Sequence, residues 1–182
     1  MSKLSILIAP DKRLNTRANE VTIINNEIKK LVNDMFDTMY HTNGLGLAAV
    51  QVGVLKRIFV MDVVHLKSTT HTPTGYKSSG KFCMINPRII ESSDEQVILE
   101  EGCLSIPKQS YEIKRLNYLT VKYRDLNNKE HTLKASGWLA RCIQHEIDHL
   151  NGILYIKHLS KLKYDIAIKK AQKLKKYYEH KQ

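Results

Sequence analysis

Three stretches of the chain carry apolar residues at helical spacing. The first predicts an amphipathic helix over about residues 27–41, with Asn25 or Asn26 as its N-cap and Asn43-Gly44 beyond its end. The second begins near Ser136 or Gly137 and stops at Asn151-Gly152, where a glycine relieves the left-handed turn. The third is long and basic, with lysines around an apolar face formed by Tyr164, Ile168, Ala171, Leu174 and Tyr178.

Shorter apolar or alternating runs predict strands. A first strand is expected within residues 1–12, where charges follow the apolar run too soon for a secretory signal. A glycine-rich loop over residues 43–53 turns into a strand, and another strand covers residues 56–62. Further strands are expected around residues 82–90, 95–101 and 117–124, and near 130–134 after a hairpin turn at 126–129. Residues 65–81, almost without apolar side chains, predict an exposed loop, and the succession of strands favours an antiparallel sheet.

The second helix contains the pentapeptide His145-Glu146-Ile147-Asp148-His149. Residues four apart stack on one face of a helix, so the two imidazoles can bind one ion while Glu146 reaches a water molecule on it. A five-residue pattern also arises by chance on a solvated helix face, and two histidines alone do not hold a catalytic metal firmly. The metal interpretation therefore needs a third ligand that leaves one coordination position free for water.

The three cysteines differ in sequence context. Cys103 follows an apolar run and a bend marked by Gly102, just before Pro107, and is the best candidate for the third ligand. Cys83 and Cys142 lie among apolar neighbours, where a thiol usually acts as a small hydrophobe. Cys142 precedes His145 by less than one helical turn, but a second thiolate would close the coordination shell and suit a structural ion better.

Length, cysteine content and charge limit the classes of protein to which the chain can belong. A chain of 182 residues fits one domain of ordinary size. An odd number of cysteines without regular spacing argues against a disulfide framework and for a reducing compartment. No stretch approaches the ~20 apolar residues that a membrane span requires. The net charge is +11, and residues 161–182 hold eight lysines against Asp165 and Glu179, an excess that favours anionic surfaces such as RNA or acidic lipid.

Hydrolysis of an amide also needs a donor for the negative charge that develops on the attacked carbonyl oxygen. The segment from Gly44 to Gln51 offers the side-chain amide of Gln51 beside small residues that permit close backbone approach. The sequence is equally consistent with tight packing at Ala48-Ala49 and with Gln51 as a surface or backbone-capping amide.

Three segments together resemble the signatures of the polypeptide deformylases: Gly-x-Gly-x-Ala-Ala-x-Gln at residues 44–51, Glu-Gly-Cys-Leu-Ser at 101–105 and Gln-His-Glu-x-Asp-His at 144–149. They occur in the family's order, and the likeness extends over nearly the whole chain. The resemblance implies that Cys103, His145 and His149 bind the metal and that Glu146 is the general acid/base. It further implies an oxyanion hole formed by Gln51 and the backbone N–H of Leu104. The substrate contacts that it implies are Gly44, Leu45, Gly46, Glu101, Gly102 and Cys142.

By the same resemblance, the chain removes the formyl group from the N-terminal formyl-methionine of nascent polypeptides and releases formate. The resemblance also implies Fe²⁺ as the natural metal, with Zn²⁺, Ni²⁺ or Co²⁺ as substitutes in purified protein, whereas ligand chemistry alone would favour zinc. The expected location is the cytoplasm. Residues 1–159 would form the catalytic domain, and residues 160–182 would add a basic helix of the same domain that docks on the ribosome. The alternative for this helix is a lysine face that only keeps the protein in solution, and neither DNA nor a membrane is expected as a partner.

The expected fold class is α+β, with antiparallel strands surrounding a buried metal-bearing α-helix, an N-terminal helix and a long C-terminal helix. Two other functions share part of the pattern. A zinc endopeptidase uses the same helix motif but lacks the Cys103 context, and an RNA-binding module with a structural metal would have four protein ligands. Ser110 stands where some relatives carry a basic residue. Asp148 is expected either in a salt bridge with Arg115 or Arg141 or on the helix surface.

Overall fold

The computed structural model describes residues 3–63 and 80–179, so all but the last two residues of the expected 65–81 loop lie outside it. The helices of the described residues are α1 (Asn26–His41), α2 (Gly137–Leu150) and α3 (Lys161–Glu179), with 3-10 turns at η1 (Lys12–Asn15), η2 (Ala49–Val52) and η4 (Tyr155–His158). The strands are β1 (Gly46–Ala48), β2 (Ile58–Met61), β3 (Phe82–Ser92), β4 (Gln96–Cys103), β5 (Ile106–Leu116), β6 (Tyr118–Arg124) and β7 (Glu130–Ser136).

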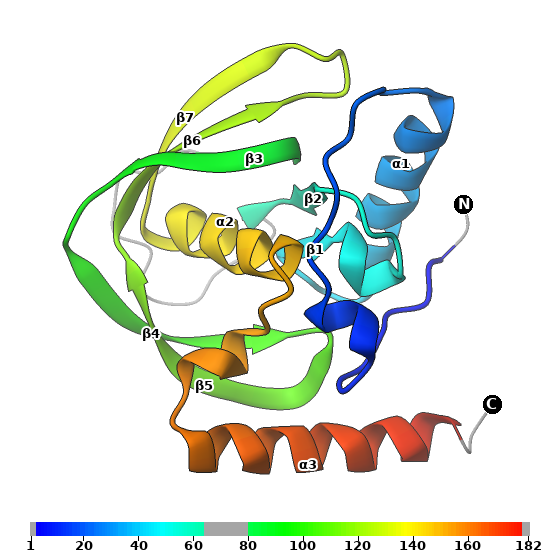
Figure 1. The fold of residues 1–182 in the computed structure, drawn as a ribbon, viewed down its shortest axis with the longest axis vertical. Helices are drawn as coiled ribbons and strands as arrows, with labels where there is room; N and C mark the ends of the chain where they lie inside the picture. Colours follow the sequence, from blue (N-terminus) through cyan, green and yellow to red (C-terminus); the bar gives the residue numbers. More distant parts are fainter. Residues whose placement is uncertain (1–2, 64–79, 180–182) are drawn as a thin grey trace.

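The strands form two antiparallel sheets that enclose α2 (Figure 1). One sheet has the order β1-β2-β3-β6-β7, and the other is the β4-β5 hairpin. The chain passes from β3 into β4 along one side of the molecule, and α2 lies between the two sheets. The predicted α+β class, with antiparallel strands around a central helix, is confirmed.

Strand β2 separates two parts of the apolar core, because side chains alternate between the faces of a strand. Ile58 and Val60 pack in the cluster that contains the apolar face of α1, whereas Phe59 and Met61 pack in the cluster that contains α2. The first helix begins as the sequence predicted, since the side chain of Asn25 accepts a hydrogen bond from the N–H of Ile28 at 3.0 Å.

Helix α2 owes its position to both of its faces. Ile143, Ile147 and Leu150 are buried in the cluster shared with the five-stranded sheet. The opposite side of α2 contacts β5 and carries polar residues instead of apolar ones. The helix ends as predicted, with Asn151 as C-cap and Gly152 at a φ of +74°, where a side chain would be strained and would also meet the backbone of Asn15.

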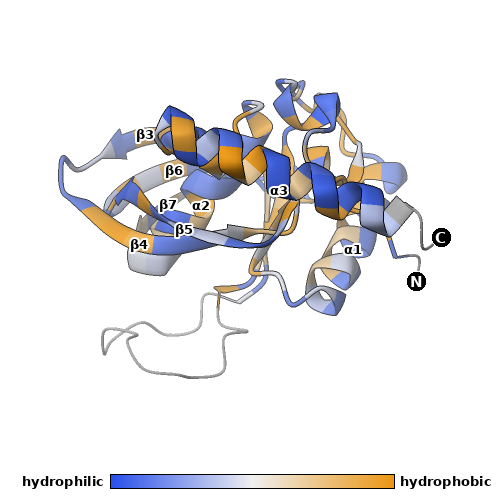
Figure 2. Cartoon of the chain, turned by 90° about the horizontal axis from the view of Figure 1, so that it is seen from below, coloured by the Kyte–Doolittle hydropathy of each residue, from blue (hydrophilic) through white to orange (hydrophobic). Residues whose placement is uncertain are grey.

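Helix α3 lies against β5 and η4 and runs along the outside of the molecule (Figures 1 and 2). Ala167 and Ala171 are fully buried against Ile106, Ile113 and Tyr155. Apolar and hydrophilic positions alternate along the helix, as the amphipathic pattern predicted. Within the described ranges no helix combines the length and the apolar character of a membrane span.

Two strand predictions differ from the structure. Residues 3–12, the described part of the N-terminal segment, contain no strand; instead the N–H of Leu7 donates to the carbonyl of Gln51 and that of Ala9 to the carbonyl of Ser105. Strand β5 was not predicted, because Pro107 stands at its start and a charged residue, Arg115, takes one of its inward positions.

Candidate functional site

Three metal-ligating groups from two elements meet between the sheets. Cys103 ends β4, whereas His145 and His149 lie one turn apart on α2, and their donor atoms all lie within 4.8 Å of one another. The Sγ of Cys103 is 3.2 Å from Nε2 of His149. Burial lowers the pKa of His149 well below its usual value, with a further effect of neighbouring cations, so this ring is neutral as a metal ligand requires.

Glu146 points from α2 into the same space. Its side chain is buried, and its Oε2 has no hydrogen-bond partner among the described residues. Burial raises the pKa of Glu146 to about 7, against the opposing effect of His145. The carboxylate has room only because residue 46 is glycine: a Cβ there would overlap Oε1 of Glu146 and lie 3.1 Å from Sγ of Cys142.

Gln51 is almost completely buried beside the cysteine, at 2 % exposure. Its Oε1 accepts from the N–H of Ala48 at 2.8 Å, which fixes the orientation of the amide. Its Nε2 therefore faces Cys103 Sγ at 3.5 Å and Ser105 Oγ at 3.2 Å. The alternative that Gln51 lies on the surface is wrong. Its side chain both caps the backbone through Oε1 and directs its NH₂ group at Cys103.

A buried ionic network supports His145 from behind. Glu101 Oε2 lies 3.0 Å from Nδ1 of His145, so that Nε2 of this ring is the nitrogen available to bind a metal ion. Arg115 and Arg141 both bind Glu101, at 3.0 Å and 2.6 Å. Burial alone would raise the pKa of Glu101, but hydrogen bonds from His145 and Arg115 lower it to about 2. Burial would likewise lower the pKa of His145, but its contacts with Cys103 and Glu101 raise it to about 10, so a metal ion competes with a proton for this ring.

A pocket of about 640 Å³ opens onto this cluster. The residues that the sequence assigned to the site and that line the pocket are Gly44, Leu45, Gly46, Gln51, Glu101, Gly102, Cys103, Leu104, Cys142, His145 and Glu146. His149 lies behind the wall and is 1 % exposed. The pocket therefore offers a water molecule and a carbonyl group access to one face of the three-donor cluster.

The sequence profile of the polypeptide deformylases matches residues 3–165. The chain belongs to the polypeptide deformylase family. A peptide deformylase from Wolbachia sp. subsp. Brugia malayi is 74 % identical over 179 residues, which cover 98 % of this chain and 99 % of that protein. The crystal structure of the Ehrlichia chaffeensis deformylase has a TM-score of 0.87 at 51 % identity, over 96 % of this chain and 97 % of that one. The same deformylase in complex with actinonin has a TM-score of 0.86 at 51 % identity, over 95 % and 98 % of the two chains. The prediction of a metal-dependent deformylase from three ordered segments is thereby confirmed.

Some pocket residues of this deformylase were not found by sequence reasoning. Trp138, at the start of α2, lines the pocket, and so does Arg141, which was considered only as a partner of Asp148. Arg141 binds Glu101 instead, and Asp148 binds Arg115. No local motif marks these residues, because their contribution depends on how β4 and β5 pack on α2.

Proposed function

We propose that the chain removes the formyl group from the N-terminal formyl-methionine of nascent polypeptides, with one divalent ion held by Cys103, His145 and His149. The observation that carries this proposal is the unpartnered carboxylate oxygen of Glu146, which is buried beside the three donors in the pocket. A buried carboxylate without a partner costs free energy in the free enzyme, and a water molecule and its proton are suitable partners in the working enzyme.

The donor set fits a catalytic ion. One thiolate and two imidazoles suit Zn²⁺, Fe²⁺, Co²⁺ or Ni²⁺, and three protein ligands leave a position for water. A divalent ion held by Cys103, His145 and His149 would supply Lewis-acid chemistry: it would lower the pKa of a water molecule and polarise the formyl carbonyl. The family resemblance supports Fe²⁺ as the natural ion, and metal analysis of protein purified without oxygen tests this.

Glu146 accepts a proton from the attacking water and returns it to the amine of the departing methionine. Burial raises the pKa of Glu146 above the usual value of a glutamate, so its carboxylate is a stronger proton acceptor than an exposed one. Its position on α2, between the two histidines, keeps the carboxylate within reach of the cluster.

Gln51 and the backbone N–H of Leu104 stabilise the negative charge on the formyl oxygen. The amide of Gln51 is held by the N–H of Ala48 with its NH₂ toward the pocket, so its donor needs no reorientation as charge develops. To bind the oxyanion, Nε2 exchanges the weak contact with Cys103 or Ser105 for the substrate oxygen.

The methionine side chain occupies the part of the pocket between α2 and the β4 strand. Leu45 and Cys142 supply apolar wall, and Gly44, Gly46 and Gly102 leave the backbone open for close approach of the peptide. Glu101 lines the same region but is held by Arg115 and His145.

Replacement of Glu146 by glutamine tests the proposed base. The variant is expected to retain one ion per chain, because the three ligands remain, and to lose turnover of formyl-Met-Ala-Ser by ~10²- to 10⁴-fold. Formate release and metal content are measured on the same anaerobic preparation. As the matched control, Cys103→Ser is expected to lose the ion as well as the activity. Turnover of Glu146→Gln at a few per cent of the parent rate, with metal bound, would rule out this base.

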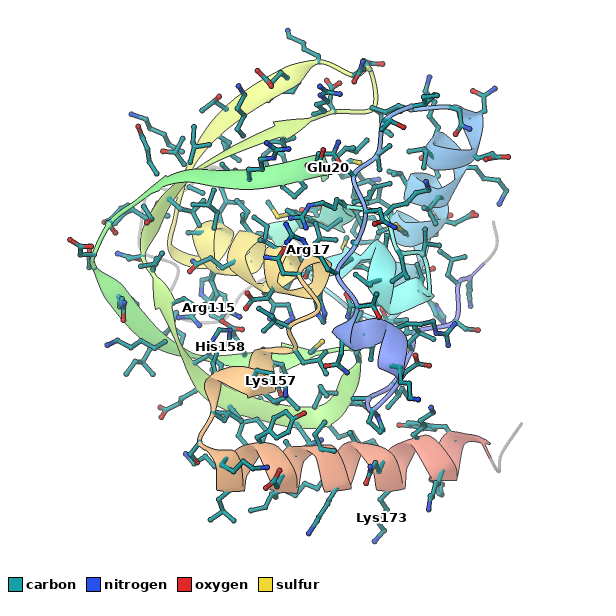
Figure 3. The ribbon with its side chains drawn as sticks, viewed as in Figure 1. Arg17, Glu20, Arg115, Lys157, His158 and Lys173 are labelled. Atoms are coloured by element: carbon teal, nitrogen blue, oxygen red, sulfur yellow. The ribbon has the colours of Figure 1, made fainter. Side chains whose placement is uncertain are left out.

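We also propose that residues 160–182 belong to the same domain as residues 1–159 and dock on the ribosome in the cytoplasm. Burial of Ala167 and Ala171 against Ile113 supports the first point, and the free thiols of the three cysteines support a reducing compartment. Lys173 of α3 points away from the body of the protein (Figure 3), and Lys169 and Lys176 of the same helix are exposed. These three side chains can contact phosphate groups of ribosomal RNA.

Charge reversal of Lys169, Lys173 and Lys176 tests ribosome docking better than truncation does, because truncation would uncover the apolar residues beneath α3. The triple glutamate variant is expected to bind ribosomes more weakly. Its affinity is also expected to depend less on salt, with a slope of log affinity against log salt that is smaller in magnitude by about 2. Its turnover of a short formyl-peptide is expected to stay at the parent value.

The control variant reverses Lys29, Lys56 and Lys134, which are exposed and lie outside α3. It has the same net charge as the test variant, so a general charge effect would weaken both equally. Equal ribosome affinities of the parent and the α3 variant would contradict docking through this helix.

A further inference from the structure

A continuous line of polar contacts leads from the protein surface to the candidate metal site formed by Cys103, His145 and His149. It begins at His158, the last residue of η4, whose side chain is 38 % exposed. Nε2 of His158 lies 2.7 Å from Oδ2 of Asp148, on the side of α2 that faces η4 and β5. Figure 3 shows His158 beside Arg115, below α2.

Arg115 occupies the centre of this line. One terminal nitrogen of its guanidinium, Nη1, binds Oδ2 of Asp148, and the other two nitrogens bind Glu101 at 3.0 Å and 3.1 Å. Glu101 in turn contacts Nδ1 of His145 at 3.0 Å. The Arg115 side chain is 5 % exposed, so its guanidinium is oriented by these two carboxylates rather than by water.

His158 and Arg115 both contact the same carboxylate oxygen of Asp148. Nε2 of His158 lies 3.3 Å from Nη1 of Arg115 as well as 2.7 Å from Asp148, and one nitrogen cannot donate to the carboxylate and accept from the guanidinium together. The shorter contact identifies Nε2–H as a donor to Asp148. Two donors from different elements, η4 and β5, therefore converge on a single oxygen and restrict its rotation.

We propose that His158 is a positioning residue for the metal site: by holding Asp148 it keeps Arg115 in the orientation that aligns Glu101 with the ring of His145. The inference rests on the proposed metal site. Without the donor at residue 158, Asp148 has one fixed partner fewer and can turn toward solvent, since its side chain is 17 % exposed. Arg115 then keeps its two contacts with Glu101 but loses the fixed partner of Nη1, so it holds the Glu101 carboxylate less firmly against the ring of His145.

The size of the effect follows from the number of contacts between His158 and the ion. Removal of a group that directly orients a ligating histidine typically costs ~10- to 100-fold in metal affinity. His158 acts through three intermediate side chains, so a ~3- to 10-fold faster release of the ion is expected for His158→Ala. The conservative variant His158→Gln keeps an N–H donor near the position of Nε2 and is expected to restore the parent value.

The protein offers a matched control in His131 of β7. Its Nε2 lies 2.8 Å from Oδ2 of Asp125, which is nearly the same histidine–aspartate contact at a similar exposure, 33 %. Among the described residues, no chain of polar contacts connects this pair to the candidate metal site. His131→Ala therefore removes an equivalent surface contact without affecting the proposed line.

The experiment uses Co²⁺-loaded full-length protein and measures the ion's release into a chelator and its visible absorption spectrum. His158→Ala is expected to release Co²⁺ ~3- to 10-fold faster with a changed spectrum, whereas His158→Gln and His131→Ala match the parent. Turnover of formyl-Met-Ala-Ser is expected to fall in kcat more than to rise in KM, because His158, Asp148 and Arg115 do not line the substrate pocket.

Several outcomes would overturn the proposal. Parent-like release and spectrum for His158→Ala would exclude a positioning role, and so would an equal defect in His158→Gln or His131→Ala. Failure of the parent itself to bind Co²⁺, or retention of the ion by Cys103→Ser, would refute the proposed metal site and the inference with it. Thermal unfolding of the metal-free variants shows whether His158→Ala also lowers the stability of the fold, which would speed release of the ion for another reason.

Discussion

Replacement of Gly46 by alanine places a methyl group against the proposed base. The added Cβ would overlap Oε1 of Glu146, lie 2.8 Å from its Cδ and lie 3.1 Å from Sγ of Cys142. The backbone of Gly46 is not in the left-handed region, so the perturbation comes from space and not from backbone strain. Both neighbours are side chains of α2 and are buried, so neither can turn into solvent in place.

The structure gives the magnitude. Moving Cδ of Glu146 from 2.8 Å to an ordinary contact distance of 3.4 Å needs a shift of about 0.6 Å, and the overlapping oxygen moves further. A misplacement of about 1 Å can cost a catalytic group ~10²-fold, so kcat is expected to fall by about 10- to 100-fold. Overpacking costs about 1–3 kcal/mol of stability, and the lower entropy of the unfolded alanine variant offsets about 0.4–1 kcal/mol of it.

The assay measures kcat for formyl-Met-Ala-Ser, metal content and thermal unfolding on the same anaerobic preparation. Gly102→Ala is the control for stability and metal content, because its added Cβ would meet only the carbonyl oxygen of Gln109, at an ordinary 3.6 Å. The variant Gly46→Ala is expected to keep its ion and to lose kcat. A fully metal-loaded Gly46→Ala enzyme with more than half of the parent kcat would refute the reasoning.

Three further outcomes test other parts of the structure. Arg141→Met leaves Glu101 buried with fewer partners and is expected to cost about 3 kcal/mol in urea unfolding; a loss below about 1 kcal/mol would contradict this. A hydrogen bond from Arg13 lowers the pKa of Asp11 to about 2, so the stability it contributes is present above pH 3.8 and disappears as the pH falls through about 2. Asp11→Asn is therefore expected to lower the unfolding free energy by at most about 1 kcal/mol at pH 7 and by less at pH 3, as measured by thermal unfolding. Chelation is expected to lower the unfolding temperature reversibly, since an ion at one thousand times its Kd stabilises the folded state by about 4 kcal/mol; an unchanged midpoint would argue against a site formed only in the folded chain.

Elements with a strong period and defined ends could be predicted from the sequence. Helices α1 and α2 have an apolar face of correct period, a capping residue such as Asn25 and a terminating glycine such as Gly152. Strands β3, β4, β6 and β7 coincide with the predicted runs to within about two residues, and their ladders are antiparallel as expected. In each case local preference and tertiary burial agree.

The failures occur where tertiary contacts replace the local pattern. Strand β5 carries Pro107 at its start and Arg115 at an inward position, so its sequence lacks the apolar alternation of a half-buried strand. The N-terminal residues look like a strand because they are apolar, yet Leu7 and Ala9 pair with isolated carbonyls of Gln51 and Ser105 rather than with a ladder. Both segments support the site, and their positions depend on partners distant in sequence.

The separation of the proposed ligands along the chain explains why ionic contacts join β4 and β5 to α2. The hairpin carries Cys103 and the helix carries the two histidines, so the distance between them depends on how the two elements are fastened. Arg141 of α2 donates to the carbonyls of Val97 and Ile113 at 2.7 Å and 3.0 Å. Apolar packing tolerates small sliding movements, whereas such hydrogen bonds weaken steeply with angle and so fix the register. The three signature segments therefore supply the donors, and Arg115 and Arg141, which lie outside those segments, bind the hairpin and α2 to each other.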